Sequence, residues 1–185
     1  MYNSLEEVEN LVKRCTKCAL CKNRTNTVFA DGNKSAKIMF IGEGPGADED
    51  REGVPFVGKA GKLMNEALKG IGLKREEIYI SNIVKCRPPG NRTPFKEEAI
   101  ACLDYLRNQV VLVNPKIVVL LGNTALKNVL GEEYSITASR GRWIEKKGIK
   151  YMPTFHPAAL LRDETKKIDF WQDLEIVKEE LEKVD

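Results

Sequence analysis

The sequence predicts an α/β protein in three layers, with a four-stranded parallel sheet between two layers of helices. Four short apolar runs have the length and composition of buried strands, at residues 37–42, 78–84, 116–121 and 149–155. Segments with apolar residues at helical spacing separate these runs. Such alternation of strands and helices is typical of a parallel sheet joined by right-handed crossovers.

The first elements follow from local signals. Ser4 and Glu7 have the spacing of a capping box, and apolar residues then recur at helical spacing, which predicts a helix to about residue 14. The polar tract 23–36 predicts a loop before the first strand. After that strand comes a glycine- and acid-rich loop, and the apolar pattern from Leu63 to Ile71 predicts a second helix.

The second and third strands are followed by helices of their own. Prolines and a glycine at 85–92 predict a loop, and Thr93-Pro94 predicts an N-cap with proline at the first helical position. The third run is continuously apolar, as in strands buried on both faces of a sheet. A helix begins at 122–125, and Gly131 ends it. The apolar face of the helix after Thr93 and that of the C-terminal helix are expected to consist of Ile100, Leu103, Leu106 and Val110, and of Phe170, Leu174, Val177 and Leu181.

Size and composition indicate a single domain over residues 1–185, long enough to bury a core. The net charge of +3 permits a nucleic-acid partner without arguing for one. No apolar run approaches the length of a membrane span, and the acidic N-terminus is unlike a secretory signal. We therefore expect a cytoplasmic protein without a membrane partner, in which cysteines serve as metal ligands or catalytic groups rather than disulfides.

Four polar or aromatic groups are expected to meet at one edge of the sheet. In parallel sheets, ligands bind at the carboxyl ends of the strands. The residues that arrive there are Glu43 with the loop that contains Phe56, Asn82, and His156, the chain's one histidine. Each has an ordinary alternative explanation, because glycine-rich turns, strand-end amides and a histidine before proline are often structural.

The five cysteines stand at positions 15, 18, 21, 86 and 102. Cys15 and Cys18 form a C-x2-C pair, Cys86 follows a strand, and Cys102 lies in a helix. Four thiolates suit either a zinc ion or an iron–sulfur cluster. A zinc ribbon more often has a second C-x2-C pair, and buried free thiols remain the alternative.

Taken in order, these stretches resemble the iron–sulfur, thermostable-type (family 4) uracil-DNA glycosylases. The resemblance runs from Cys15 to about Arg162. It rests on C-x2-C at 15–18, on GEGPG-x2-ED-x2-G-x-PFVG at 42–58, on N-x3-CRPP-x-NR at 82–92, on Cys102, and on HP-x2-L at 156–160.

The resemblance implies a glycosylase-like fold and a DNA-repair hydrolase that flips uracil out of DNA, cleaves its N-glycosidic bond and leaves an abasic site. It also implies a structural 4Fe–4S cluster on Cys15, Cys18, Cys86 and Cys102, with Cys21 outside the pattern. The partner is uracil-containing DNA, single- or double-stranded, and the protein is expected to be a monomer.

The base pocket is also implied by the resemblance. Phe56 stacks on uracil, and Gly42 belongs to the residues that bind the uracil ring. The amide of Asn82 forms hydrogen bonds with the Watson–Crick edge of uracil and rejects cytosine. His156 donates to the uracil oxygen that becomes negative as the bond breaks. Leu160 matches the apolar wedge that fills the hole left by the flipped base.

Two acidic residues are assigned less directly. Related enzymes carry a water-activating carboxylate just before the first proline, where this chain has Gly44. The catalytic water is then left to backbone groups and to Glu43. Glu49 occupies the position of a side chain that blocks the methyl group of thymine in related enzymes.

Phosphate contacts are expected from arginines in loops. The candidates are Arg87, Arg92, Arg140, Arg142 and Arg162. Three other functions remain open: a sister glycosylase for other deaminated bases, a non-catalytic iron–sulfur or zinc DNA-binding module, and a domain fused to a DNA polymerase.

Overall fold

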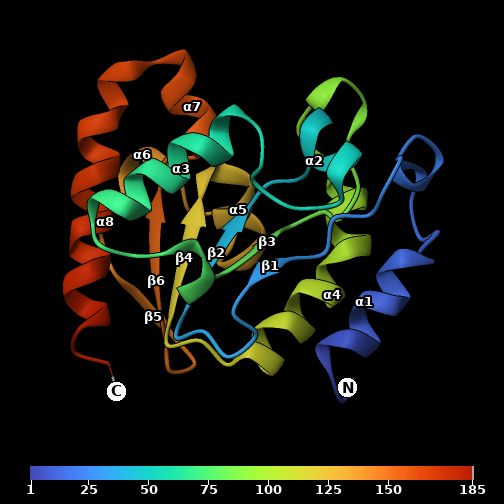
Figure 1. Cartoon of the computed structure of the whole chain (residues 1–185), viewed down its shortest axis with the longest axis horizontal. Helices are drawn as coiled ribbons and strands as arrows, with labels where there is room; N and C mark the ends of the chain where they lie inside the picture. The colour runs from blue at the N-terminus through green and yellow to red at the C-terminus, as the bar shows by residue number, and fades with distance from the viewer. Residues whose placement is uncertain (185) are drawn as a thin grey trace.

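The computed structural model describes residues 1–184 and shows one mixed sheet flanked by helices (Figure 1). In chain order the elements are α1 (Leu5–Lys13), η1 (Ala19–Lys22), β1 (Asp31–Gly32), β2 (Ile38–Gly42), α2 (Ala47–Glu52), α3 (Lys59–Gly70), η2 (Arg75–Glu77), β3 (Tyr79–Asn82), η3 (Pro89–Asn91), α4 (Lys96–Val113), β4 (Ile117–Leu121), α5 (Gly122–Val129), α6 (Ile136–Ser139), β5 (Ile144–Lys146), β6 (Ile149–Thr154), α7 (Pro157–Arg162), η4 (Glu164–Lys166) and α8 (Lys167–Leu181).

The four predicted strands form the parallel centre of the sheet. The strand order is β1-β3-β2-β4-β6-β5, and the pairs β3–β2, β2–β4 and β4–β6 are parallel. Two short strands that the sequence did not predict, β1 and β5, pair antiparallel at the two edges. The α/β prediction is therefore confirmed, and the sheet has six strands rather than four.

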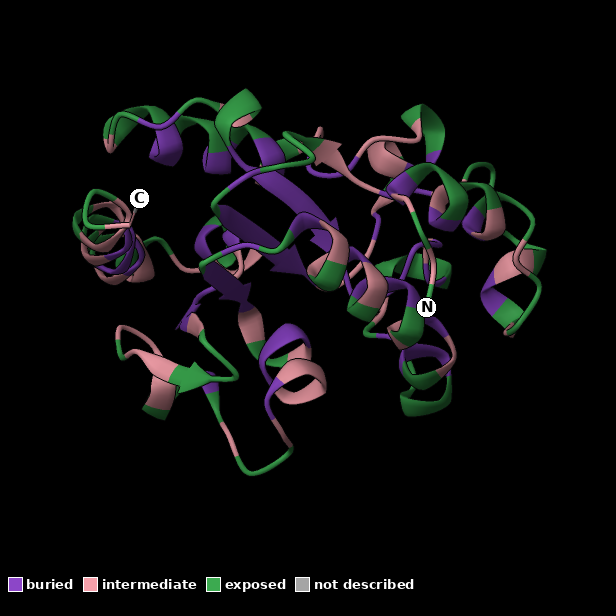
Figure 2. Ribbon diagram, turned by 90° about the horizontal axis from the view of Figure 1, so that it is seen from below, coloured by how far each residue is buried: buried purple, intermediate pink, exposed green. Residues whose placement is uncertain are grey.

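Helices cover both faces of the sheet, as the view along it shows (Figure 2). Right-handed crossovers place α3 on one face and α4 and α5 on the other, because the chain moves outward from β2 to β3 and then back across to β4. Helices α7 and α8 pack against α3, and α1 packs against α4. The central strands are buried along their whole length, so the main core lies on both sides of β2 and β4.

Three local predictions need correction. The loop at 42–58 contains a helix, α2, whose start the side chain of Glu49 stabilises. Helix α4 begins at Lys96 with Phe95 as its N-cap, two residues after the predicted Thr93-Pro94 start. Its buried face includes Leu106, but Ile100 is 58% exposed, so the predicted apolar face is rotated from the real one.

Within residues 1–184, no helix is long and apolar enough to cross a membrane.

Candidate active site

The carboxyl ends of β2, β3 and β6 bring the predicted pocket residues to one place. Gly42 and Asn82 are the last residues of β2 and β3, and they face one another across the pair. A side-chain carbon added to Gly42 would lie 2.6 Å from Asn82 Oδ1 and 2.6 Å from Phe56 Cζ. Because glycine leaves this space free, the phenyl ring and the amide can both approach the end of β2.

Asn82 is the one residue of the described chain with a buried side-chain nitrogen or oxygen that lacks a hydrogen-bond partner. Its side chain is 2% exposed and its Oδ1 atom has no partner. A buried polar atom left unpaired costs about 1–3 kcal/mol, so few persist without a functional reason. The atom is therefore available as an acceptor for a ligand.

Phe56 is held in an unusual backbone conformation beside this amide. Its φ angle is +52°, in the left-handed region, which costs about 1–3 kcal/mol for a residue other than glycine. Its ring stacks on the imidazole of His156 with centroids 5.5 Å apart and an angle of 28° between the planes. Helix α3 closes on its backbone at Gly61, where an added side-chain carbon would lie 2.0 Å from Phe56 O.

His156 is placed as a neutral donor. Its Nδ1 accepts the backbone N–H of Ala158 at 3.1 Å, at the start of α7. Since Nδ1 is the acceptor, the ring proton lies on Nε2. Burial, with a smaller contribution from the positive charge of Arg162, lowers the pKa of His156 to about 4. The imidazole is therefore uncharged at neutral pH.

Glu43 accepts a hydrogen bond from helix α5, which follows the neighbouring strand β4. Its Oε2 accepts the hydroxyl of Thr124, on α5 after β4, at 2.6 Å. The carboxylate thus lies at the same carboxyl edge as Asn82 and is partly exposed. Its role toward a water molecule remains a prediction.

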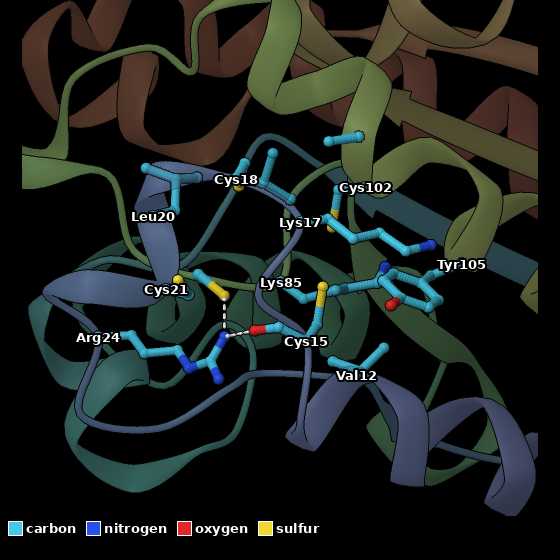
Figure 3. A pocket seen from close by; sticks show the side chains of 13 residues that line it. Val12, Cys15, Lys17, Cys18, Leu20, Cys21, Arg24, Lys85, Cys102 and Tyr105 are labelled. Carbon is cyan, nitrogen blue, oxygen red and sulfur yellow. Dashed lines mark hydrogen bonds between the residues drawn. The ribbon is translucent and has the colours of Figure 1, made fainter.

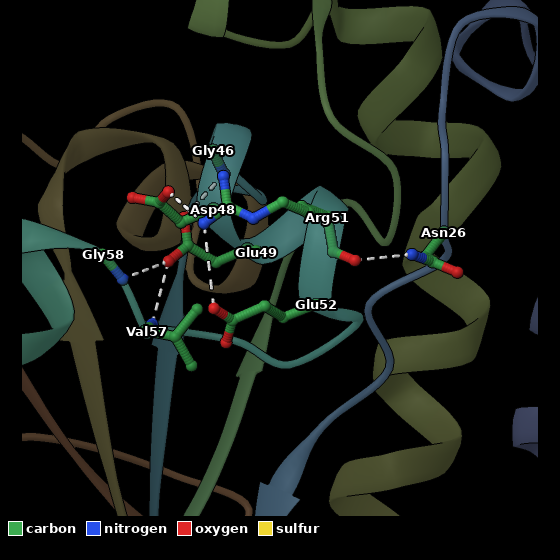
Figure 4. A network of polar contacts seen from close by, with 8 residues as sticks. All are labelled: Asn26, Gly46, Asp48, Glu49, Arg51, Glu52, Val57 and Gly58. Atoms are coloured by element: carbon green, nitrogen blue, oxygen red, sulfur yellow. Dashed lines mark hydrogen bonds and ion pairs between the residues drawn. The ribbon is translucent and has the colours of Figure 1, made fainter.

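Glu49 organises the loop that carries Phe56 (Figure 4). Its Oε1 accepts from the backbone of Gly46 at 3.1 Å, and its Oε2 accepts from Val57 at 2.8 Å and Gly58 at 2.7 Å. Three backbone N–H groups donate to this carboxylate, so Glu49 fixes the backbone conformation of the loop. Its predicted action against the thymine methyl group stays a prediction.

The cysteines gather at a second location, around one pocket (Figure 3). Cys15 and Cys18 come from the segment after α1, Cys86 from the segment after β3, and Cys102 from α4. Cys21 lines the same pocket, so position alone does not separate it from the predicted four. As the side chains stand in residues 1–184, no group of three His, Cys, Asp or Glu is placed to hold a metal ion.

Burial and a neighbouring cation act in opposite directions on these cysteines. Burial raises the pKa of Cys18 and of Cys86, and raises that of Cys102 to about 11. Arg24 donates to Cys15 O at 2.7 Å and to Cys86 Sγ at 3.4 Å. A cationic donor beside a sulfur suits a thiolate rather than a thiol.

A buried lysine joins the cysteine pocket to the first site. Lys85 lines the cysteine pocket, and its Nζ donates to Asn82 O at 2.6 Å and to Ser81 Oγ at 2.7 Å. Burial lowers the pKa of Lys85 to about 8. Sequence reasoning missed Lys85, because a lysine between a strand and a cysteine gives no sign that it is buried.

The predicted DNA contacts are mixed. Leu160 is fully buried (0% exposed), whereas its neighbour Leu161 is 48% exposed, so in this conformation Leu160 does not reach the surface as a wedge must. Arg162 is exposed at the end of α7.

Three of the four remaining arginines have partners within the protein. Arg92 makes a bidentate ion pair with Glu98, at 2.7 and 3.0 Å. Arg140 pairs with Asp173 and Arg87 donates to Asn91, whereas Arg142 is exposed. A guanidinium that already has protein partners is less free to bind phosphate.

Comparison with known proteins gives a consistent picture. The family model described as the uracil DNA glycosylase superfamily matches residues 29–175. The chain is 48% identical to a type-4 uracil-DNA glycosylase of Thermotoga maritima over 97% of this chain and 92% of that protein. It is 47% identical to the type-4 enzyme of Sulfurisphaera tokodaii over 86% and 76% of the two chains, and 42% identical to that of Archaeoglobus fulgidus over 85% and 83%.

Proposed function

The chain belongs to the uracil-DNA glycosylase superfamily, among relatives of the type-4 family, and from this membership we propose how it excises uracil from DNA. The reaction is hydrolysis of the N-glycosidic bond, which leaves an abasic site and begins repair. The observation that carries the proposal is the unpaired Oδ1 of Asn82 beside the ring of Phe56 and close to the end of β2.

Base recognition is assigned to Phe56 and Asn82. A nucleotide must leave the duplex before its glycosidic bond can be reached. The phenyl ring offers a flat apolar surface for the flipped base, and the amide offers an acceptor for the uracil N–H and a donor for the adjacent carbonyl. Cytosine presents the opposite pattern and would leave the buried acceptor unpaired, which is how such sites discriminate strongly.

His156 stabilises the leaving group. As the bond breaks, negative charge develops on the uracil ring and on its carbonyl oxygen. A fixed hydrogen-bond donor at that oxygen lowers the activation barrier. The neutral imidazole supplies Nε2–H for this purpose, because Nδ1 is already an acceptor for Ala158. Loss of a donor of this kind typically slows chemistry about 100- to 1,000-fold.

Glu43 is proposed to orient the water. The carboxylate is anchored by Thr124 and lies at the same edge of the sheet as Asn82. Gly44 stands where related enzymes carry the water-activating carboxylate, so no side chain at that position can act as base. Glu43→Gln, which retains a hydrogen-bond acceptor, should slow single-turnover excision; full activity would remove Glu43 from the mechanism.

We also propose that Cys15, Cys18, Cys86 and Cys102 hold a 4Fe–4S cluster. The support is the donor set, since four thiols from three separate parts of the chain line one pocket and thiolates are the ligands of such clusters. When bound, the cluster supplies a covalent tie between these parts, and the hydrolytic reaction needs no electron from it. Arg24 would donate to the coordinated sulfur of Cys86.

The cysteine assignment has a matched control inside the chain. Cys86→Ser should lower iron and acid-labile sulfide in anaerobically purified protein, whereas Cys21→Ser should leave both unchanged. Equal loss of iron in the two variants would show that the ligand set is wrong. Zinc in place of iron would support the alternative metal.

DNA binding is proposed to involve Arg162 and the exposed face of α7. One chain supplies every residue of the pocket, so we propose that a single copy suffices. Because contacts to phosphate are electrostatic, binding to uracil-containing DNA should weaken as salt rises.

The deciding experiment is excision from labelled oligonucleotides that contain one uracil, thymine, cytosine or hypoxanthine. Abasic sites only at uracil are expected. Phe56→Leu should lose activity, while Phe29→Leu, a change at a similarly buried phenylalanine in the core, should retain it. Cleavage at another base would favour a sister glycosylase, and binding without cleavage would favour a DNA-binding module.

A further inference from the structure

We propose that Arg75 is a positioning residue that holds Phe56 in the orientation needed to stack on the base. This inference rests on the proposed function, because it assigns Arg75 through the role of Phe56. Arg75 begins η2, just before β3, and lies 19 positions after Phe56 in the chain. No sequence motif marks it.

One guanidinium spans the backbone of the Phe56 turn. Nη1 of Arg75 donates to Phe56 O at 2.8 Å, and Nη2 donates to Pro55 O. The same Nη1 atom also reaches Asn65 Oδ1, on α3, at 3.2 Å. Two consecutive carbonyl groups are therefore fixed by a single side chain, through the rigid planar fork of donors that arginine has and lysine lacks.

The guanidinium is itself fixed from the other side. Its Nε donates to Asp31 Oδ2 at 2.9 Å, and the arginine side chain is only 20% exposed. Asp31 belongs to β1, the short edge strand that pairs with β3. The edge strand thus has a function beyond pairing, since it places a carboxylate where Arg75 needs one.

The turn requires such support. Phe56 has a positive φ angle, which L-residues other than glycine rarely adopt, and such conformations persist only where the surroundings hold them. Helix α3 presses on the same residue from one side at Gly61, where no side chain could fit. With Arg75 removed, we expect the turn to relax and the ring to leave its position beside Asn82 and His156.

The test compares Arg75→Lys, Asp31→Asn and Phe56→Ala with Lys150→Met. Lys150 also pairs with a carboxylate, Glu180, but it lies near the amino end of β6, and its loss controls for a general loss of stability. Arg75→Lys keeps the charge but cannot bridge two carbonyls and Asp31 together. Displacement of a reacting geometry by about 1 Å can cost about 100-fold, so we expect a fall in kcat of about 10- to 100-fold.

Three readouts separate positioning from stability. Arg75→Lys should weaken inhibition by free uracil, yet leave binding to abasic-site DNA, which has no base to stack, within about twofold of the unaltered protein. Asp31→Asn should show the same pattern to a smaller degree. In the double variant Phe56→Ala/Arg75→Lys, activity should be no lower than in Phe56→Ala alone, because Arg75 acts through Phe56.

The proposal is overturned if Arg75→Lys behaves as Lys150→Met does, or if its effect adds fully to that of Phe56→Ala. Backbone amide exchange tests the positioning role of Arg75 independently of the reaction. Residues 56–61 should exchange faster in Arg75→Lys and Asp31→Asn than in Lys150→Met, even if the protein excised no uracil. Unchanged exchange would overturn the positioning role, whereas absent excision with faster exchange would overturn the proposed function alone.

Discussion

Replacement of Asn82 by leucine should separate the stability of the protein from its activity. Leucine has the same branching as asparagine and nearly the same size, so it fills the site without a cavity. The substitution removes Oδ1, which is buried without a partner. Removing an unpaired buried polar atom should recover about 1–3 kcal/mol of unfolding free energy. For a chain of this length, each kcal/mol corresponds to a rise in Tm of about 2–4 °C.

The same substitution should abolish base recognition. Without the amide, neither the N–H nor the adjacent carbonyl of uracil has a partner, and single-turnover excision should fall about 100-fold or more. Thermal unfolding and excision are measured on the same preparation. An increase in Tm together with a loss of activity is the expected result.

Gln109→Leu is the matched control. Gln109 is equally buried, but its Nε2 donates to Phe29 O and to Tyr79 Oη, and its Oε1 accepts from Ser81. Its loss leaves several buried groups unpaired, so this variant should be destabilised. If Asn82→Leu were destabilised to the same degree, the amide would be a structural group and our interpretation of its free oxygen would be wrong.

The geometry of the site supports four further predictions. Because the chain has one histidine, NMR titration of the imidazole reports His156 alone. The imidazole should titrate near pH 4 rather than 6.5, with the proton on Nε2 at neutral pH. An ordinary pKa would contradict the neutral-donor assignment. The unfolded chain takes up a proton on His156 at higher pH than the folded chain does, so stability present above about pH 6.5 should decline towards pH 4. In His156→Gln this part of the decline should be absent. Denaturant unfolding across the same pH range measures it. Gly61→Ala should displace Phe56 and reduce excision more than it reduces Tm, and equal activity would show that the turn tolerates the methyl group. Leu161→Ala should weaken binding of uracil-containing duplex with little change in Tm, whereas Leu160→Ala should lower stability by about 2–5 kcal/mol. The reverse pattern in binding and melting assays would support the predicted role of Leu160 as the wedge.

The centre of the fold could be predicted from the sequence because its signals are local. Short apolar runs marked the four central strands, and all four form the parallel centre of the sheet. The edge strands β1 and β5 contain two and three residues, too few to show a pattern, and they form only because a neighbouring strand offers free backbone groups. Helix α2 was missed because its sequence is acidic and short, and its stability comes from the N-terminal cap.

Burial of single residues was less predictable than the elements that carry them. Leu160 and Leu161 are identical in type and adjacent in sequence, yet one is buried and the other exposed, because only the direction of α7 decides between them. Arg75 and Lys85 gave no signal at all, since half of their partners are backbone carbonyls, which every sequence has. The gathering of Gly42, Asn82 and His156 was predictable, because topology alone brings strand ends together.

The short segment between Asn82 and Cys86 belongs to both sites described above. Its two ends contribute the amide of the base pocket and a thiol of the cysteine pocket, and Lys85 between them bonds back to Asn82 O. Because only three residues separate Asn82 from Cys86, a displacement of the chain at either pocket is transmitted directly to the other, and the bond from Lys85 limits how far the two can move apart.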